Sequence, residues 1–423
     1  MDGAGSAPAL IVTLGCRLNT ADSALIATRL AGSGYRVVES TDTPALIVIN
    51  SCAVTAEAVR KTRQLIRRLR REHPTAEIVV TGCAVDAAAS SLAGDGGDLL
   101  LPNREKALIA ARLTETGDMV PETAVGGPVF SEGVLSSFPF RSRAFIKIQE
   151  GCDNFCSYCI VPHLRGRERS RAFDEVIADC RQAIAAGFPE VVLTGVNTCA
   201  YRDGTRGLDD VVRAIGALPG EFRIRLSSTE PHPDNLALLE AMAKPENRVC
   251  RFLHLSLQHG SDRILKRMNR HYTRAEYAAF AAAARQALPG IHLGTDVIAG
   301  FPGETDEDFA DSLDFIRSIG FANIHIFSYS RRPGTPAATW PAQVPAETIH
   351  RRAAELRRVA DAAAAAFRRS RLGETLPVIF ERAEHGVIRG WSDNYLEVRA
   401  PEGAFPLRRI VEVKATPESL GIE

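Results

Sequence analysis

Three cysteines lie within eight residues of one another in the middle of the chain, in the segment GCDNFCSYCIVP. Cys152, Cys156 and Cys159 have the spacing CxxxCxxC, and thiolates grouped in this way are ligands for iron–sulfur clusters. A four-iron cluster is usually held by four thiolates, so three of them leave one iron open to a substrate or cofactor. The spacing therefore predicts a cluster at which chemistry takes place.

A zinc ion is the alternative occupant of this motif. Structural zinc sites usually combine two pairs of closely spaced ligands into a closed tetrahedron, and no second pair follows Cys159. We therefore favour the iron–sulfur cluster. Phe155 and Tyr158, which lie between the cysteines, are expected to shield it, because a hydrophobic shell limits the access of water.

A second set of cysteines ends three apolar runs near the N-terminus. The runs PALIVTLGC, PALIVINSC and AEIVVTGC end in Cys16, Cys52 and Cys83. Helical patterns separate these runs, and strands that alternate with helices predict a parallel sheet. Because the carboxyl ends of parallel strands share one crevice, the three thiols could converge on a second cluster. Ordinary buried cysteines are the alternative, which three cysteines in equivalent positions make less attractive.

The rest of the chain predicts an α/β fold with three parts. Six strand candidates that alternate with helix-length segments predict an open, partial TIM-type (βα)6 barrel, and the CxxxCxxC loop follows the first of them, where such barrels build active sites. The candidates are AFIKIQEG, EVVLTGV, RIRLSST, FLHLSLQ, HLGTDVIAG and NIHIFSYS. The predicted domains are a parallel-sheet βαβ domain at 8–120, a linker at 121–140, the barrel at 141–371 and a small all-β module at 372–423.

The CxxxCxxC loop and the barrel resemble the radical S-adenosylmethionine (SAM) superfamily. The resemblance implies that SAM binds the open iron of a cluster held by Cys152, Cys156 and Cys159, and that its cleavage yields a 5′-deoxyadenosyl radical. It also implies that the strand ends hold the cofactor, although turn chemistry alone could explain each of those residues. The residues predicted to contact SAM are Thr194, Gly195, Asn197, Ser228, Glu230, Gln258, Asp296 and Gly300.

Across almost its whole length the chain is similar to the radical SAM methylthiotransferases. The resemblance implies a second [4Fe-4S] cluster on Cys16, Cys52 and Cys83 that donates a methylated sulfur, and a C-terminal TRAM-like module. Sulfur then joins a carbon whose C–H bond is neither acidic nor electrophilic enough for general-base or nucleophilic chemistry, which is why a radical is needed. The expected cofactors are therefore two [4Fe-4S] clusters and SAM.

A basic run after Cys52, AVTAEAVRKTRQLIRRLRREH, carries the prediction of the substrate. It resembles the methylthiotransferase branch that acts on N6-threonylcarbamoyladenosine at position 37 of tRNA. Clustered cations can contact several RNA phosphates, although a solvated amphipathic helix is the alternative. The predicted RNA-binding residues, which include two from a second basic run, are Arg60, Lys61, Arg63, Arg67, Arg68, Arg165 and Arg167.

The composition limits the other possibilities. The 423 residues contain 51 basic and 51 acidic side chains, so RNA binding has to come from local patches. The first residues lack a basic n-region, and we expect a cytoplasmic protein with neither a signal peptide nor a membrane span. The expected partners are tRNA, an external electron donor and a sulfur source, without DNA.

Other functions stay open. A methylthiotransferase of the same family could act on isopentenyladenosine in tRNA or on an aspartate of a ribosomal protein. A radical methyltransferase that binds cobalamin is a further possibility, but the first 140 residues contain no DxHxxG-type loop. The alternative from another class is a non-catalytic RNA-binding protein that a metal ion stabilises.

Overall fold

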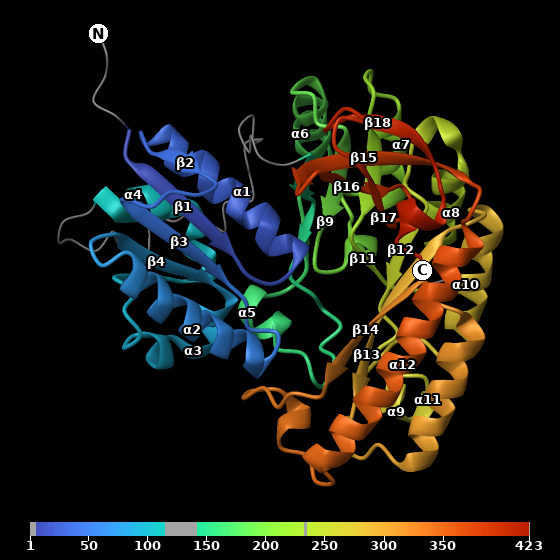
Figure 1. Cartoon of the computed structure of the whole chain (residues 1–423). Coiled ribbons are helices and arrows are strands. Elements are labelled where there is room, and N and C mark those ends of the chain that lie inside the picture. The colour runs from blue at the N-terminus through green and yellow to red at the C-terminus, as the bar shows by residue number, and fades with distance from the viewer. Residues whose placement is uncertain (1–5, 115–141, 232–234, 423) are drawn as a thin grey trace.

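The computed structural model describes residues 6–114, 142–231 and 235–422, and the predicted linker 121–140 lies outside them. Figure 1 shows three parts: an N-terminal sheet domain in blue, a barrel that runs from green to orange, and a small red β module. The predicted α/β fold is therefore confirmed. No helix in these described ranges is long and apolar enough to cross a membrane.

The N-terminal domain contains a parallel sheet with the strand order β2-β1-β3-β4-β5. The three runs that end in cysteines form its central strands, and two short edge strands complete it. The strands are β1 (Pro8–Thr13), β2 (Arg36–Val38), β3 (Leu46–Ser51), β4 (Glu77–Gly82) and β5 (Leu99–Leu101). The helices are α1 (Arg17–Gly32), α2 (Ala56–Glu72), α3 (Cys83–Leu92), η1 (Asn103–Leu108) and α4 (Ile109–Thr114). Strand–helix alternation therefore predicted this domain correctly.

Helix α2 shows how the basic run folds. Thr55 caps its N-terminus by accepting a hydrogen bond from the backbone N–H of Ala58. Thr62, Ile66 and Leu69 recur at helical spacing and are buried, so they fix one face of α2 against the sheet. The arginines and the lysine must therefore occupy the remaining faces.

The barrel is built from two sheets with parallel strands, in the orders β10-β9-β6 and β11-β12-β13-β14. A single bridge, Ile224 to Val249, continues from the first sheet toward the second. The strands are β6 (Arg143–Lys147), β9 (Glu190–Thr194), β10 (Arg223–Leu226), β11 (Ser228–Thr229), β12 (Phe252–Leu255), β13 (His292–Ala299) and β14 (Asn323–Ser328), with the small hairpin pair β7 (Gln149–Glu150) and β8 (Arg169–Ser170). All six predicted strand candidates are confirmed, but RIRLSST is divided between β10 and β11.

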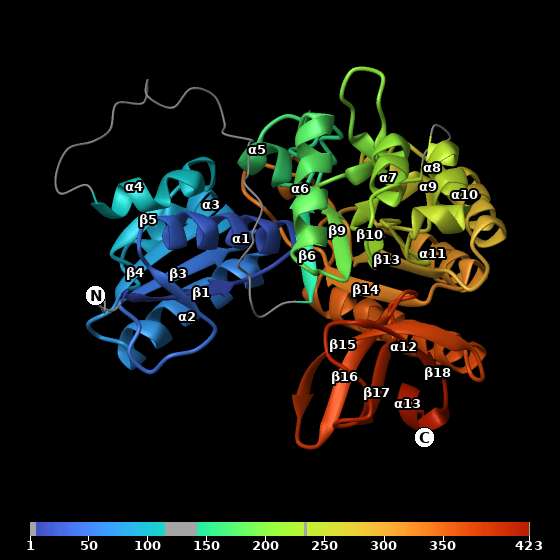
Figure 2. The ribbon, with the colours of Figure 1, turned by 90° about the horizontal axis from the view of Figure 1, so that it is seen from above.

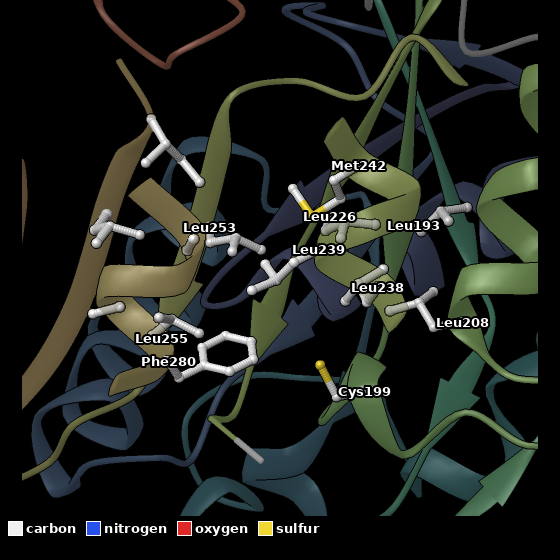
Figure 3. Packing of buried hydrophobic residues seen from close by; sticks show 14 of the residues in the cluster. Leu193, Cys199, Leu208, Leu226, Leu238, Leu239, Met242, Leu253, Leu255 and Phe280 are labelled. Carbon is white, nitrogen blue, oxygen red and sulfur yellow. The ribbon is translucent and has the colours of Figure 1, made fainter. Parts of the chain in front are cut away.

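Helices cover the outer face of the barrel. They are α6 (Phe173–Ala185), α7 (Leu208–Gly216), α8 (Leu236–Ala243), α9 (Asp262–Arg267), α10 (Arg274–Ala287), α11 (Asp306–Ile319) and α12 (Ala346–Ser370). The short helix α5 (Val161–Arg165) packs instead against α3 and η1 of the N-terminal domain. Alternate strand residues such as Leu193, Leu226 and Leu253 pack against helix residues such as Phe280 in one core (Figure 3). Because side chains alternate along a strand, the residues between them face the concave side of the barrel.

The C-terminal module is an antiparallel sheet with the strand order β17-β16-β15-β18. Its elements are β15 (Thr375–Glu384), β16 (Val387–Ser392), β17 (Glu397–Pro401), β18 (Ile410–Lys414) and α13 (Pro417–Leu420). Figure 2 shows the module against one end of the barrel. The predicted all-β character is confirmed.

Two buried arginines of β10 join the module to the barrel. Arg223 donates to the carbonyls of Pro377 and Trp391, at 2.8 and 2.9 Å. Arg225 donates to the carbonyls of Ser392 and Asp393, both at 3.0 Å. Both guanidinium groups also pair with the buried carboxylate of Glu190. The module therefore closes the end of the barrel at which the strands begin.

Candidate active site

The loop with the CxxxCxxC motif lies between β7 and α5, above the carboxyl ends of the barrel strands. The backbone N–H of Cys159 donates to the carbonyl of Cys156 at 2.9 Å, which folds the loop back on itself. Burial raises the pKa of the Cys159 thiol to about 12, and the nearby thiols of Cys156 and Cys152 add to that rise. All three thiols are free, and they are close enough to influence one another.

Arg270 brings a positive charge to this loop. One of its Nη atoms lies 3.4 Å from the Sγ atom of Cys156, and the other lies 2.8 Å from a carboxylate oxygen of Glu230. Glu230 in turn accepts hydrogen bonds from the side chains of Asn154, at 2.7 Å, and Asn197, at 3.2 Å. The carboxylate of Glu230, which follows β11, thus ties the CxxxCxxC loop to the segment after β9.

The side chains between the cysteines differ in exposure. Tyr158 is half-buried and makes an edge-on contact with Phe301, with ring centroids 6.4 Å apart. Phe155 is 40% exposed, and its ring contacts His163 and the guanidinium of Arg167. Together with Cys156 and the segment around Thr335, Phe155 lines a cavity of about 350 Å³. The predicted shielding therefore fits Tyr158 better than Phe155.

The predicted SAM contacts fall into separate places. Asn197 and Glu230 meet beside Cys156, as described above. Thr194 is the last residue of β9 and Gly195 follows it, and a Cβ atom at Gly195 would lie 2.8 Å from Oε1 of Gln149. Ser228 accepts a hydrogen bond from Thr198 through its carbonyl. These contacts to SAM stay predictions.

Three further predicted contacts lie along β13. The backbone N–H of Gln258 donates to the carbonyl of Asp296 at 2.8 Å. Gly300 is buried in the turn after β13, where its N–H is bonded to Glu304 and a Cβ atom would meet Ile349 of α12. Turn geometry thus accounts for Gly300, while Asp296 faces the concave side of the barrel.

The second cysteine set is brought together by the N-terminal sheet. Cys52 and Cys83 directly follow β3 and β4, and Cys16 lies three residues after the end of β1; the carboxyl ends of these strands lie side by side. Burial raises the pKa of the Cys52 thiol to about 11, and the thiols of Cys16 and Cys83 raise it further because they are close by. The predicted convergence of the three strand ends is therefore seen in the fold.

Two glycines make this convergence possible. Gly15 has a φ of +98°, and a Cβ atom there would lie 2.5 Å from Cβ of Cys52. Gly82 has a φ of +93°, and its Cβ would lie 2.5 Å from the carbonyl oxygen of Ser51. L residues rarely adopt such φ values, and neither position has space for a side chain.

Helix α5 lies between the N-terminal sheet domain and the barrel (Figures 1 and 2). It begins two residues after Cys159, and its Leu164 packs against the N-terminal core that contains Cys83 and Val85. The charge of the next residue, Arg165, acts on the Cys83 thiol and opposes the rise in its pKa that burial causes. The CxxxCxxC loop therefore leads, through α5, directly to the domain that carries Cys16, Cys52 and Cys83.

Arg165 belongs to a buried network of charges between the two domains. Its guanidinium lies 3.1 Å from Asp22 of α1 and 2.8 Å from Glu150 of β7. Lys106 and Lys147 pair with the same Asp22. Burial raises the pKa of Glu150, but Lys147 and Arg165 outweigh that effect and lower it to about 2. The carboxylates of this network are therefore ionised.

This burial corrects the prediction that Arg165 binds RNA. Its side chain is only 3% exposed, and its donors are used by Glu150, Asp22 and Asn19. Sequence spacing could not reveal this, because Asp22 and Asn19 come from α1 of the N-terminal domain. Arg167, two residues later, is 75% exposed and pairs with Asp153 on the surface.

The predicted RNA contacts on α2 lie at its surface, but most are ion-paired. Arg60 pairs with Glu57, and Arg68 lies 3.8 Å from Glu72. Arg63 and Arg67 both pair with Asp95. Lys61 is exposed on the same helix. Their contact with RNA stays a prediction, and the net positive charge of this face is smaller than the sequence suggests.

Both thiol sets suit iron–sulfur clusters. Each offers three free thiols in close proximity, and each has an arginine against one thiol, Arg270 at Cys156 and Arg165 at Cys83. Thiolate ligands are negatively charged, so a fixed cation beside them favours the ligating form. The residues present therefore fit the predicted groups.

Several residues of the site were not predicted from the sequence. Arg270 and Asn154 are polar residues in a loop context, where their partners cannot be read from spacing. His254 and His325 flank Asp296 on neighbouring strands, and only the strand register shows that they meet. The alternation of polar with apolar residues in the run FLHLSLQ was a sequence signal that His254 lies on the face opposite the core.

Family models match most of the described chain. Residues 146–316 match the model described as Radical SAM superfamily, and residues 9–101 match the one described as uncharacterized protein family UPF0004. The first covers the CxxxCxxC loop and the barrel, and the second covers Cys16, Cys52 and Cys83.

Curated relatives match nearly the full length. The threonylcarbamoyladenosine tRNA methylthiotransferase MtaB of Chlamydia pneumoniae is 37% identical over 96% of this chain and 94% of its own. MtaB of Bacillus subtilis is 34% identical over 95% of this chain and 92% of its own. The tRNA-2-methylthio-N(6)-dimethylallyladenosine synthase of Cereibacter sphaeroides is also 34% identical, over 98% of this chain and 97% of its own.

Solved structures are similar in fold. The radical SAM methyltransferase TsrM from Kitasatospora setae has a TM-score of 0.58 at 17% identity and covers 79% of this chain and 77% of its own. The cobalamin-dependent SAM radical enzyme OxsB has a TM-score of 0.53 at 12% identity, over 84% of this chain and 61% of its own. At such identities the likeness concerns the fold alone.

Proposed function

The chain belongs to the radical SAM family of tRNA methylthiotransferases, and from this premise we propose that it methylthiolates C2 of N6-threonylcarbamoyladenosine at position 37 of tRNA. One observation carries the proposal: α5 joins two sets of three free thiols within one chain. A reaction that needs both a radical and a sulfur donor requires two such centres near each other.

We assign one [4Fe-4S] cluster to each thiol set. Cys152, Cys156 and Cys159 would hold the cluster that binds SAM, and the strand-end set of Cys16, Cys52 and Cys83 would hold the second. When bound, the two clusters and SAM supply the radical oxidant, the sulfur and the methyl group. An external electron donor and a sulfur source complete the proposed partners.

The protein's own residues position these groups and keep water away. Arg270 holds a positive charge against Cys156, while Glu230 fixes Arg270 and Asn154 at the same time. Half-buried Tyr158 packs edge-on against Phe301 beside the loop. A rigid, partly dry loop limits side reactions of a radical, because few solvent or side-chain groups can approach it.

Transfer RNA as the substrate class is supported by the names of the relatives, whether their adenosine is threonylcarbamoyl- or dimethylallyl-substituted. We propose that the protein is cytoplasmic. We also propose that six basic residues contact the phosphates of the tRNA: Arg60, Lys61, Arg63, Arg67, Arg68 and Arg167. An RNA phosphate would have to compete with Asp95 for Arg63 and Arg67. Such contacts would make tRNA binding weaken with rising salt.

The choice of threonylcarbamoyladenosine has two supports. The basic segment after Cys52 resembles that branch, and the relative with the highest identity among those compared, at 37%, carries its name, as do two at 34%. Relatives named for the dimethylallyl branch reach 36% identity, so the substrate needs its own experiment.

Mass spectrometry of tRNA nucleosides from a strain that lacks the gene tests the proposal. We expect the methylthio form of threonylcarbamoyladenosine to disappear and to return with the wild-type gene. The Cys16→Ala gene should not restore it. An unchanged level would overturn the proposal, and loss of the methylthio form of dimethylallyladenosine instead would assign the chain to the other branch.

A further inference from the structure

Three polar side chains form a cluster on neighbouring strands of the barrel: His254 of β12, Asp296 of β13 and His325 of β14. Nε2 of His254 lies 3.0 Å from one carboxylate oxygen of Asp296, and Nδ1 of His325 lies 3.2 Å from the other. Asp296 and His325 are direct partners in the strand register. We call these residues the His–Asp–His cluster.

The cluster faces the concave side of the barrel. Leu253, Leu255 and Val297, which alternate with His254 and Asp296, are buried in the core beneath the helices. The side chains of the cluster must therefore point the other way. His325 is 54% exposed and Asp296 is 23% exposed, so this face is open to solvent.

The cluster lies close to both cysteine-bearing parts of the protein. Arg270, which contacts Cys156, also donates to the carbonyl of Ser256, two residues beyond His254 on β12. On the other side, the backbone N–H of Ala56, four residues after Cys52, donates to the hydroxyl of Ser330, two residues beyond the end of β14. A base held between the two thiol sets would thus have the cluster as part of its wall.

Asp296 still has room for a ligand. Burial raises the pKa of Asp296, but hydrogen bonds from His254 and His325 outweigh it and leave the pKa below its usual range. A carboxylate can accept about four hydrogen bonds, and each oxygen here accepts one from an imidazole. Gly294 is paired with His254 in the register, and a Cβ atom there would lie 3.2 Å from Nδ1 of His254, so the glycine lets that ring lie against the strand.

We propose that the His–Asp–His cluster binds the polar substituent on N6 of the target adenosine. This inference rests on the proposed function. The threonylcarbamoyl group carries N–H and hydroxyl donors, which match the acceptor oxygens of Asp296. A dimethylallyl group offers none of these, and burying it against the cluster would leave polar groups unpaired.

A divalent metal ion is the other ligand that two histidines and a carboxylate could hold. The geometry favours the substituent. The two imidazoles address different oxygens of Asp296, and Nε2 of His325 is engaged by the side-chain amide of Asn323 at 2.9 Å. The cluster is thus already a hydrogen-bonded unit, and the lone pairs of Asp296 that the imidazoles do not use are the acceptors for a ligand.

Equilibrium binding of anticodon stem-loops to the reconstituted protein tests the inference without turnover. Three stem-loops would be compared, with threonylcarbamoyladenosine, dimethylallyladenosine or unmodified adenosine at position 37. The variants are Asp296→Asn and His325→Leu, and His385→Leu in an exposed turn of the C-terminal module is the control. His325 is half exposed, so its replacement should leave the fold intact.

We expect the wild-type protein and the control to prefer the threonylcarbamoyl stem-loop. In each variant this preference should fall roughly 10- to 100-fold, the range expected for a lost hydrogen bond to a charged group, while affinity for unmodified adenosine stays constant. A preference that persists in both variants would overturn the inference alone. A wild-type preference for the dimethylallyl stem-loop would overturn the proposed substrate with it. A divalent ion other than iron, bound by the wild-type protein and lost in both variants, would replace the inference with a metal site.

Discussion

The two cysteine sets are built in opposite ways. Cys152, Cys156 and Cys159 lie on one short loop, and their proximity follows from their spacing in the chain. Cys16, Cys52 and Cys83 are more than 30 residues apart and meet only because β1, β3 and β4 are neighbours in one sheet. The first set is a local feature, whereas the second depends on the packing of a whole domain.

The difference shows where each set is vulnerable. A loop-borne set tolerates changes elsewhere in the fold, because loop closure over few residues costs little. A set assembled from strand ends depends on every contact that holds the strands in register. Four experiments test this contrast, and they follow from the largest expected effect to the smallest.

Removal of one thiol from either set should abolish methylthiolation, but the two variants should differ in whether they still cleave SAM. We expect Cys16→Ala to bind about four irons per chain in place of about eight, and to retain the cleavage of SAM. Cys156→Ala should also bind about four irons but lose that cleavage. Iron analysis after anaerobic reconstitution and assay of 5′-deoxyadenosine measure both effects. Cys180→Ala, in the barrel core, is the control and should bind iron as the wild type does. Eight irons in Cys16→Ala would rule out the second cluster.

Loss of Arg165 should destabilise the link between the sets. Arg165→Leu leaves Asp22 and Glu150 buried with one cation fewer, which typically costs about 3–5 kcal/mol. Denaturant unfolding of the apoprotein measures this cost. The matched control is Arg167→Leu, whose exposed ion pair should contribute about 1 kcal/mol or less. Equal losses in the two variants would contradict the role of the buried network.

Acid should weaken the same link by a smaller step. The folded-state pKa of Glu150 is about 2, below its ordinary value of 4.5. Its contribution to stability is therefore complete above about pH 4.5 and is lost as the pH falls toward 2. Unfolding measured across this range should show that slope in the wild-type protein and a shallower slope in Glu150→Gln. Parallel slopes would show that Glu150 does not contribute in this way.

Gly15→Ala should impair the strand-end set alone. Its positive φ costs an alanine about 1–2 kcal/mol, and the new Cβ would also press against Cys52. Gly34→Ala is a matched control, since Gly34 has a φ of +88° but nothing within 4 Å of the added Cβ. Iron content should fall toward about four per chain only in Gly15→Ala. If both variants bind the same amount of iron, the contact between the added Cβ atom and Cys52 does not affect the cluster.

Strand–helix alternation and cysteine spacing predicted much of the molecule. The β1, β3 and β4 runs, the six barrel strands and the all-β end were all visible as local patterns of apolar residues. The edge strands β2 and β5 were missed, because three residues are too few to show a period. The split of RIRLSST into β10 and β11 was missed because only pairing with different neighbours reveals it.

Side-chain partners were the harder part of the site. Arg165 lies in a run of arginines that looks like an RNA surface, yet its partners come from α1 and β7, which the sequence keeps far apart. Arg270 and His254 likewise gained their roles from contacts across the barrel. Periodicity tells which face a residue occupies, but a buried charge is explained only by the groups that neutralise it.

The attachment of the C-terminal module bears on how this protein could be divided or recombined. Arg223 and Arg225 are buried, and four of their hydrogen bonds end on backbone carbonyls of the module. A truncation before β15 would leave these two guanidinium groups without those acceptors at the open end of the barrel. The module therefore cannot be exchanged alone between related proteins, and a chimera would have to take β10 and the module from the same parent protein.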